Sequence, residues 1–339
     1  MGIDLNTVWF LLVGALLGGY AVLDGFDLGV GALHLFAKTD EQRRTFLNAI
    51  GPVWDGNEVW LVTGGGALFA AFPGAYATAF SGFYLAMVLL LVGLIFRAVA
   101  IEFRSKHPGA RWREAWDRSF AVASVGSSFL MGVAFGNVIL GVPIDGAGEF
   151  AGSFVSLLNP FALLTGLTTV ALFTMHGAIF LVLKTEGDTQ RVVMSWVNNA
   201  IIFFVVCYAT TTMATLVYRP EMAALIKAHP WLFVVPASTM LASANVPRSM
   251  HHGWFGRAFV SSTSAVLGLF GLVGLGMYPI LIRATDSATS LTIYNVASSP
   301  QTLKIMLVIA LIGIPLVLAY TISIYWIFRG KVKLDSMSY

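Results

Sequence analysis

The most informative segment of the chain is NTVWFLLVGALLGGYAVLDGFDLGVGALHLF, residues 6–36. Its apolar part is longer than the roughly 20 residues that a helix needs to cross a bilayer. It lacks the positively charged leader and short apolar core of a cleavable signal peptide, so we expect a permanent first span. Asp24 and Asp27 lie inside it, and a carboxylate at membrane depth is a functional candidate because its desolvation is costly.

The composition of the whole chain is typical of an integral membrane protein. Of its 339 residues, 57% are hydrophobic and only 11% are charged, whereas a soluble protein carries about 25% charged residues. The net charge of +3 comes without a long basic run, which argues against a nucleic-acid-binding protein. The single cysteine, Cys207, excludes a disulfide scaffold.

Further apolar segments of helical length follow the first one. We predict eight more spans, at 46–72, 78–103, 118–140, 160–184, 192–217, 231–247, 257–282 and 303–328. Strand-like alternation is absent from the sequence, and helices are then the way to satisfy the backbone in lipid. We therefore expect an all-α integral membrane protein with nine transmembrane helices.

A weak internal repeat divides the chain into two halves. Two pairs of motifs correspond, Asp24-Gly25 with His176-Gly177 and Trp54-x-x-Asn57 with Trp196-x-x-Asn199. Such a repeat predicts two pseudo-symmetric four-helix bundles, at 1–140 and 141–282. A ninth helix and a short cytoplasmic tail would follow at 283–339.

The positions of Lys and Arg predict the orientation. Cytoplasmic loops retain basic residues, and one set of span ends holds 15 of the 20 basic residues, whereas four lie at the other ends and Arg97 lies inside a span. We therefore expect the N-terminus outside and the C-terminus in the cytoplasm.

Charged side chains at membrane depth gather on the predicted inner side of the bilayer. The candidates are the acid pairs Asp24/Asp27 and Asp55/Glu58, each spaced i, i+3, with Arg97 and Glu102 at a similar depth. Buried carboxylates can take up and release protons near neutral pH, so we predict a proton path that is reachable from the cytoplasm. For Asp24 and Asp27, a structural ion pair with Arg97 is an alternative.

The second acid pair also has a structural interpretation. If the second helix begins near Pro52, Asp55 lies in its first turn and complements the helix dipole. The capping box Thr39-x-x-Gln42 predicts an earlier start, which would make Pro52 a kink and place Asp55 well above the helix end. We favour the earlier start and a functional Asp55, while Glu58 could also extend to the inner interface.

No catalytic, cofactor or metal site is indicated by the sequence. Membrane heme proteins usually present paired histidines on facing helices, and His176 is the one histidine well inside a predicted span. We interpret it as a hydrogen-bonded core residue.

Four segments resemble subunit II of the cytochrome bd quinol oxidases, including their cyanide-insensitive relatives. They are VLDGFDLGVGAL at 22–33, GPVWDGNEVWLVTGGGALFAAFP at 51–73, FSGFYLAMVLLLVGLIFRAVAIEFRSK at 80–106 and TIYNVASSPQTLKIMLV at 292–308. The resemblance implies the nine-helix fold, a bacterial plasma membrane and a partner, subunit I, that carries the hemes b and d and the quinol site. The complex would oxidise quinol and reduce dioxygen to water.

The same resemblance implies roles for individual residues. Asp55 would help to carry protons from the cytoplasm toward the heme site, with Trp54 and Asn57 as neighbours, and Glu58 stands where some members carry Gln. From their depth in the predicted span, and not from the resemblance, Arg97 and Glu102 are candidates to support the path or the subunit interface. Whether a quinone binds to this chain and whether the complex has a small accessory subunit are questions that the sequence leaves open. The alternatives to an oxidase subunit are a self-contained proton-coupled transporter or channel and an assembly scaffold.

Overall fold

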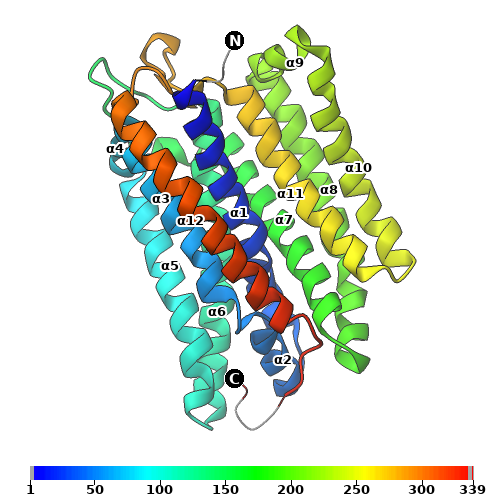
Figure 1. Ribbon diagram of the computed structural model, residues 1–339. Coiled ribbons are helices and arrows are strands. Elements are labelled where there is room, and N and C mark those ends of the chain that lie inside the picture. Colours follow the sequence, from blue (N-terminus) through cyan, green and yellow to red (C-terminus); the bar gives the residue numbers. More distant parts are fainter. Residues whose placement is uncertain (1–3, 335–337, 339) are drawn as a thin grey trace.

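Long helices run side by side along one common direction in the computed structural model, which describes residues 4–334 and 338 (Figure 1). Within that part of the chain, seven helices are long and apolar enough to cross a membrane. They are α1 (Leu5–Leu33), α5 (Tyr84–Phe103), α6 (Ala110–Leu140), α7 (Pro160–Lys184), α8 (Gly187–Tyr218), α11 (Phe255–Met277) and α12 (Pro300–Ile327). The prediction of an all-helical membrane protein is therefore confirmed.

Two further segments decide how many spans there are. The pair Pro220–Ala228 and Pro230–His251, which contains α9 (Ala224–Ala228) and α10 (Val234–His251), is bent by 118° and makes an eighth span if it is counted as one. The helix α3 (Trp54–Ala71) packs beside α1, but its first turns are polar. The predicted number of nine spans stays a prediction.

Short elements connect the helices at the two ends of the molecule. They are the helices α2 (Asp40–Ile50) and α4 (Pro73–Gly82), the 3-10 turns η1 (His34–Phe36), η2 (Arg104–Lys106), η3 (Phe154–Leu157), η4 (Pro220–Ala223), η5 (Pro230–Phe233) and η6 (Ser287–Thr289), and the antiparallel strands β1 (Ile280–Ile282) and β2 (Leu291–Thr292).

The start of the second predicted span is split into two helices. The Thr39 hydroxyl accepts from the Gln42 backbone N–H as predicted, but the Gln42 side chain accepts from the backbone N–H of Lys38 instead of that of Thr39, so the predicted capping box is only half formed. It caps only α2, however, because the chain turns after Ile50 and α3 begins at Trp54. Pro52 cannot donate a helical hydrogen bond. The continuous, kinked helix that we favoured is thus not formed.

The helices α1 and α7 cross in backbone contact. A Cβ atom added to Gly29 would lie 1.8 Å from the Phe173 carbonyl oxygen, and one added to Gly177 would lie 2.5 Å from the Gly29 carbonyl carbon. Only glycine allows so close an approach. The crossing fixes the centre of the molecule, around which the other long helices pack.

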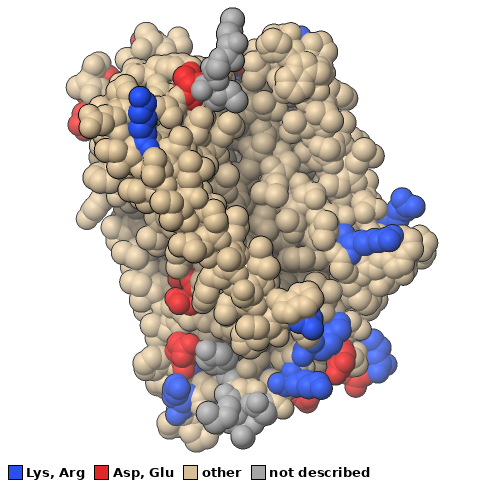
Figure 2. Space-filling view, in the orientation of Figure 1, with Lys and Arg blue, Asp and Glu red and all other residues tan. Residues whose placement is uncertain are grey.

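Charged side chains gather at the two ends, with a broad uncharged band between them (Figure 2). We call one of these the basic end. It is made by residues 34–53, 104–118, 184–191, 248–257 and 329–334, which begin at or near the last residues of α1, α5, α7, α10 and α12. The strands β1 and β2 lie at the opposite end.

Candidate functional site

The centre of the candidate site is an ion pair between Asp24 on α1 and Arg97 on α5, both 0% exposed. Nη1 of Arg97 donates to Oδ2 of Asp24 at 2.7 Å, and Nη2 donates to Oδ1. The same Nη2 lies 3.1 Å from Oε1 of Glu58 on α3. A buried charge needs partners of this kind, and bidentate pairing is the strongest that arginine makes. Three helices are therefore joined by one guanidinium.

A second arm of the site begins at Asp27, which lies one turn further along α1 and is also 0% exposed. Nδ2 of Asn57 donates to Oδ2 of Asp27 at 2.7 Å and to the Leu23 carbonyl at 3.2 Å. The Tyr325 hydroxyl on α12 donates to Oδ1 of Asn57 at 2.9 Å. Oδ1 of Asp27 has no hydrogen-bond partner among the residues that the structure describes.

The two arms meet on the first turns of α3. Asn57 turns toward Asp27, while the next residue, Glu58, turns toward Arg97 and keeps 24% of its side chain exposed. Asp24 and Glu58 therefore share the Arg97 guanidinium, and Asp27 lies one helical turn from Asp24 with Asn57 as its partner. Repulsion between neighbouring carboxylates in a site of low dielectric constant is relieved when one of them binds a proton.

The structure brings together five of the eight residues that the sequence singled out, namely Asp24, Asp27, Asn57, Glu58 and Arg97. The other three lie outside this connected group. Asp55 is exposed in the first turn of α3, where it also complements the helix dipole. Trp54 packs half-buried against the core, and Glu102 is half-buried next to the last residue of α5.

A second charged cluster, at the basic end, escaped the sequence analysis. Asp117 on α6 lies 2.5 Å from His34 and from Nε of Arg104, and 2.9 Å from Nη1 of Arg43. Arg104 also donates to Asp40 at 2.7 Å. Because these residues come from four separate segments, the spacing along the chain carries no signal of the cluster.

His176 is a saturated core residue, as predicted. Its Nδ1 lies 2.7 Å from the Ser262 hydroxyl and its Nε2 lies 3.0 Å from the Val22 carbonyl. The ring stacks on Phe259 with the centroids 5.0 Å apart. With both nitrogens occupied, this histidine does not fit an axial heme ligand.

Metal ligation is also not supported elsewhere in the described part of the chain, where no group of three or more His, Cys, Asp and Glu side chains could hold an ion. The other buried histidine, His34, has its Nε2 atom 2.5 Å from Asp117, and its Nδ1 atom has no partner among the described residues.

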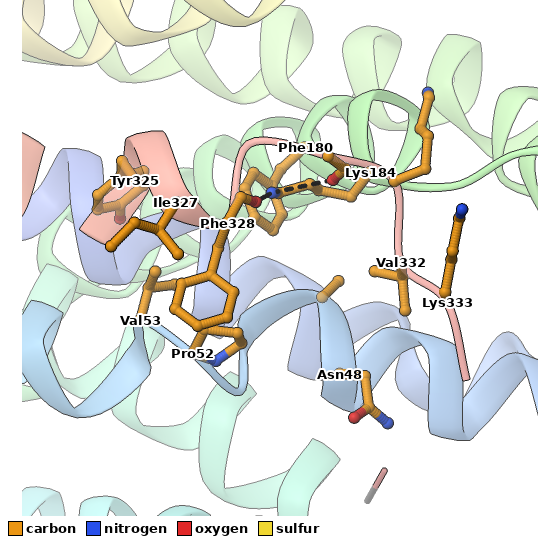
Figure 3. A pocket seen from close by; sticks show the side chains of 13 residues that line it. Asn48, Pro52, Val53, Phe180, Lys184, Tyr325, Ile327, Phe328, Val332 and Lys333 are labelled. Carbon is orange, nitrogen blue, oxygen red and sulfur yellow. Dashed lines mark hydrogen bonds between the residues drawn. The ribbon is translucent and has the colours of Figure 1, made fainter. Parts of the chain in front are cut away.

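A cavity of about 290 Å³ opens beside the second arm, at the basic end (Figure 3). Pro52, Val53, Phe180, Tyr325 and Phe328 form its apolar wall, and Lys184, Lys331 and Lys333 lie around it. Lys331 donates to the Leu183 and Thr185 carbonyls at 2.9 and 2.8 Å, and burial lowers the pKa of its ammonium group. Lys184 and Lys331 attach the segment after α12 to the end of α7.

The fold and the site together define a polytopic helical membrane subunit with a buried acid–arginine group. A family model described as cytochrome bd terminal oxidase subunit II matches residues 5–328. The chain belongs to this family and is a subunit of a quinol oxidase complex. It is a multi-pass inner-membrane protein, and family membership implies hemes in the complex, a partner subunit I, and quinol and oxygen as substrates.

Individual relatives agree with this assignment. The cytochrome bd-I ubiquinol oxidase subunit 2 of Escherichia coli (strain K12) is 36% identical over 369 residues, covering 98% of this chain and 96% of its own. The cytochrome bd ubiquinol oxidase subunit 2 of Bacillus subtilis (strain 168) is 36% identical over 337 residues and 97% of both chains. The bd oxidase of Geobacillus thermodenitrificans has the same fold, with a TM-score of 0.80 and 18% identity over 96% of this chain and 98% of that one.

Proposed function

We propose that this chain is the subunit of the oxidase that binds no heme itself, completes the complex with subunit I, shields the heme pocket and supplies protons from the cytoplasm. Hemes b and d and the quinol site belong to subunit I in this proposal. The proposal requires neither a quinone bound to this chain nor an additional small subunit in the complex. The observation that carries it is the buried Asp24–Arg97–Glu58 group, which opens toward the surface of α3.

The proposed proton path starts at Asp55, which is exposed near the basic end. Glu58 follows at i+3 on the same face of α3, and its partly exposed carboxyl group can receive a proton from Asp55 or from water. Arg97 stays protonated and charged throughout, so it does not itself pass a proton on. It holds Glu58 and Asp24 close together, so that a proton can pass from one carboxyl to the other and on to Asp27.

The docking face for subunit I is formed by α3, α5 and α12 in this proposal. The most apolar part of α12 has no residue buried within this chain, and that of α5 is only 17% buried. On α3, a Cβ atom added to Gly65 or Gly66 would meet nothing within 4 Å. Small residues on an open face allow a second helix to approach closely. Glu58, which receives protons from Asp55 or from water in this proposal, would then lie beside the subunit interface.

The proposed topology places the basic end in the cytoplasm and the N-terminus outside, following the distribution of Lys and Arg. Nine spans result if α3 and the bent segment that contains α10 are added to the seven long helices. Residues 1–140 and 141–282 then form the two four-helix bundles, and 283–339 the ninth helix and tail.

Copurification tests the division of labour. The chain would be tagged and expressed with and without subunit I, and reduced-minus-oxidised spectra would be recorded. We expect hemes b and d in stoichiometric amounts only when subunit I copurifies. Hemes retained by the isolated chain would disprove the proposal, and a transporter would require proton flux by the chain alone in vesicles.

Asp55→Asn tests the proton path. This neutral isostere should lower oxygen-reductase turnover while the hemes and assembly are retained. Asp188→Asn is the matched control, because Asp188 is an exposed acid in the first turn of α8 at the same end. Turnover equal to that of the control would remove Asp55 from the path, and loss of the complex would favour a structural role.

A further inference from the structure

The Asn57 side chain between Asp27 and Tyr325 has one orientation available to it. It is 1% exposed, and its amide group donates to Asp27 Oδ2 and to the Leu23 carbonyl. A reversed amide would place its oxygen against the Leu23 carbonyl, which is only an acceptor. The Tyr325 hydroxyl holds the amide from the other side by donating to its oxygen.

This arrangement makes the two oxygens of Asp27 different. Oδ2 is always occupied, because an amide donor faces it at 2.7 Å. Oδ1 is buried and has no partner among the described residues. A proton that arrives at Asp27 therefore binds at Oδ1, since a proton on Oδ2 would displace the amide hydrogen bond. The hydroxyl of Tyr325 helps to maintain this difference although it does not touch Asp27.

We propose that Tyr325 is a positioning residue for Asp27: it fixes the Asn57 amide, and Asp27 consequently takes up and releases its proton at Oδ1 alone. The role is to keep one oxygen free, so that the proton leaves by the same atom that received it. This inference rests on the proposed proton path, which it extends to a residue of α12.

The surroundings of Asp27 contain few other groups that could produce the same effect. The titratable and charged ones are Asp24 on α1, Glu58 on α3, Arg97 on α5, His176 on α7 and Tyr325 on α12. Arg97 is engaged by Asp24 and Glu58, and both nitrogens of His176 are occupied. Tyr325 alone among them hydrogen-bonds to Asn57, and its ring also lines the cavity at the basic end (Figure 3).

The test uses the complete oxidase, purified with subunit I. Tyr325→Phe removes a single hydroxyl group, and Tyr208→Phe on α8 is the matched control, because Tyr208 is a half-buried tyrosine stacked on Phe204 away from the site. We expect Tyr325→Phe to lower turnover about fivefold, the rate equivalent of one neutral hydrogen bond. The KM for quinol should be unchanged, and the pH profile of turnover should shift.

Infrared difference spectroscopy gives a readout that a purely structural role would not change. The C=O stretching band of protonated Asp27 is assigned by its loss in Asp27→Asn. In Tyr325→Phe we expect this band to split or shift, because the released amide allows the proton on either oxygen. An unaltered band and an unaltered pH profile, as in Tyr208→Phe, would overturn the proposal, as would loss of the hemes from Tyr325→Phe.

A double variant shows whether Tyr325 acts through Asn57. Asn57→Leu removes the amide, so Tyr325→Phe should have no additional effect on the pH profile in that background. Additive effects would overturn the proposal. If Asp27→Asn itself leaves turnover unchanged, the proton path through Asp27 fails; if Asp27→Asn lowers turnover while Tyr325→Phe does not, only the positioning role fails.

Discussion

The site around Asp24 on α1 and the site around His176 on α7 are built on helices that cross at Gly29 and Gly177, yet they use opposite chemistry. At the first site, the carboxyl groups of Asp24 and Glu58 share one guanidinium, and an oxygen of Asp27 has no partner among the described residues. At the second, every polar atom of the histidine is bonded. The incomplete site is the one through which we propose that protons pass, whereas the saturated site joins α1, α7 and α11 through one histidine.

The two sites also differ in energetic cost, because only the Asp24–Arg97 site buries charged groups. Desolvated charges destabilise a structure unless their partners remain, while a neutral, fully bonded ring costs little. Variants that remove one partner should therefore have very different effects at the two sites.

The largest expected effect is that of Arg97→Met. It leaves the buried Asp24 carboxylate without its cation, which should lower the free energy of unfolding by about 3–5 kcal/mol. Thermal unfolding of the purified complex, followed by heme release, measures this loss. Arg118→Met is the control, because Arg118 makes an exposed pair with Glu114 on α6 and should change stability by less than about 0.5 kcal/mol.

An Arg97→Met protein as stable as its control would show that the pair contributes nothing. The double variant Asp24→Leu/Arg97→Met removes both charges and should recover most of the lost stability, because no unpaired ion remains.

Gly177→Ala should have the next largest effect, because it acts on the crossing that joins the two sites. The added Cβ atom meets the backbone of Gly29, which cannot move aside as a side chain can. We expect the free energy of unfolding to fall by about 1–3 kcal/mol, measured by the same heme-release curve. Gly274→Ala on α11 meets nothing within 4 Å and should be neutral or stabilising. Equal unfolding temperatures for both variants would contradict the close crossing.

His176→Leu tests the saturated site directly. Loss of the bonds to Ser262 and Val22 should cost about 1–3 kcal/mol, while turnover of the assembled oxidase stays normal. Asp24→Asn should also lose stability, because Arg97 then keeps only Glu58 as an ionic partner, and it should in addition lower turnover in the fraction that retains its full heme content. A turnover defect in His176→Leu that persists at full heme content would place the histidine in the proton path and remove the contrast between the sites.

The sequence predicted the buried charged residues of the Asp24 site, but it did not predict the hydrogen bond that connects the site to Tyr325 on α12. Hydropathy and the rarity of membrane acids pointed to Asp24, Asp27 and Arg97, because burial of charge is visible in a single segment. Tyr325 gave no such signal. It lies 268 residues from Asn57, and in the sequence it is one of several aromatic residues at the end of an apolar helix. The pairing is produced by packing, which local patterns do not record.

The break before α3 shows a second limit. The N-cap at Thr39 was predicted correctly, although the reciprocal bond of Gln42 goes to Lys38, and an N-cap carries no information on how far the helix continues. Pro52 is compatible with a kink and with a new start. The tertiary contacts of Asn57 and Glu58 require α3 to approach α1 and α5, and they favour the new start.

The smallest expected effect concerns Asp4, the exposed carboxyl at the other end of α1. Its Oδ1 accepts the Thr7 backbone N–H at 2.8 Å as the N-cap, and this hydrogen bond lowers the pKa of Asp4 below its ordinary value of 3.8. A lowered pKa in the folded state means that the stabilisation is complete above pH 3.8 and is lost as the pH falls through the folded value.

Hydrogen exchange at the Thr7 amide measures this cap without unfolding the complex. Asp4→Ala should reduce the local stability by about 0.5–1 kcal/mol at pH 6, whereas Asp4→Asn keeps the cap and removes the pH dependence. Equal protection in Asp4→Ala and the unaltered chain would show that the cap contributes nothing. Because Asp4 is exposed, its charge is solvated in both states, and the same chemical group that dominates stability at Asp24 has only a local effect here.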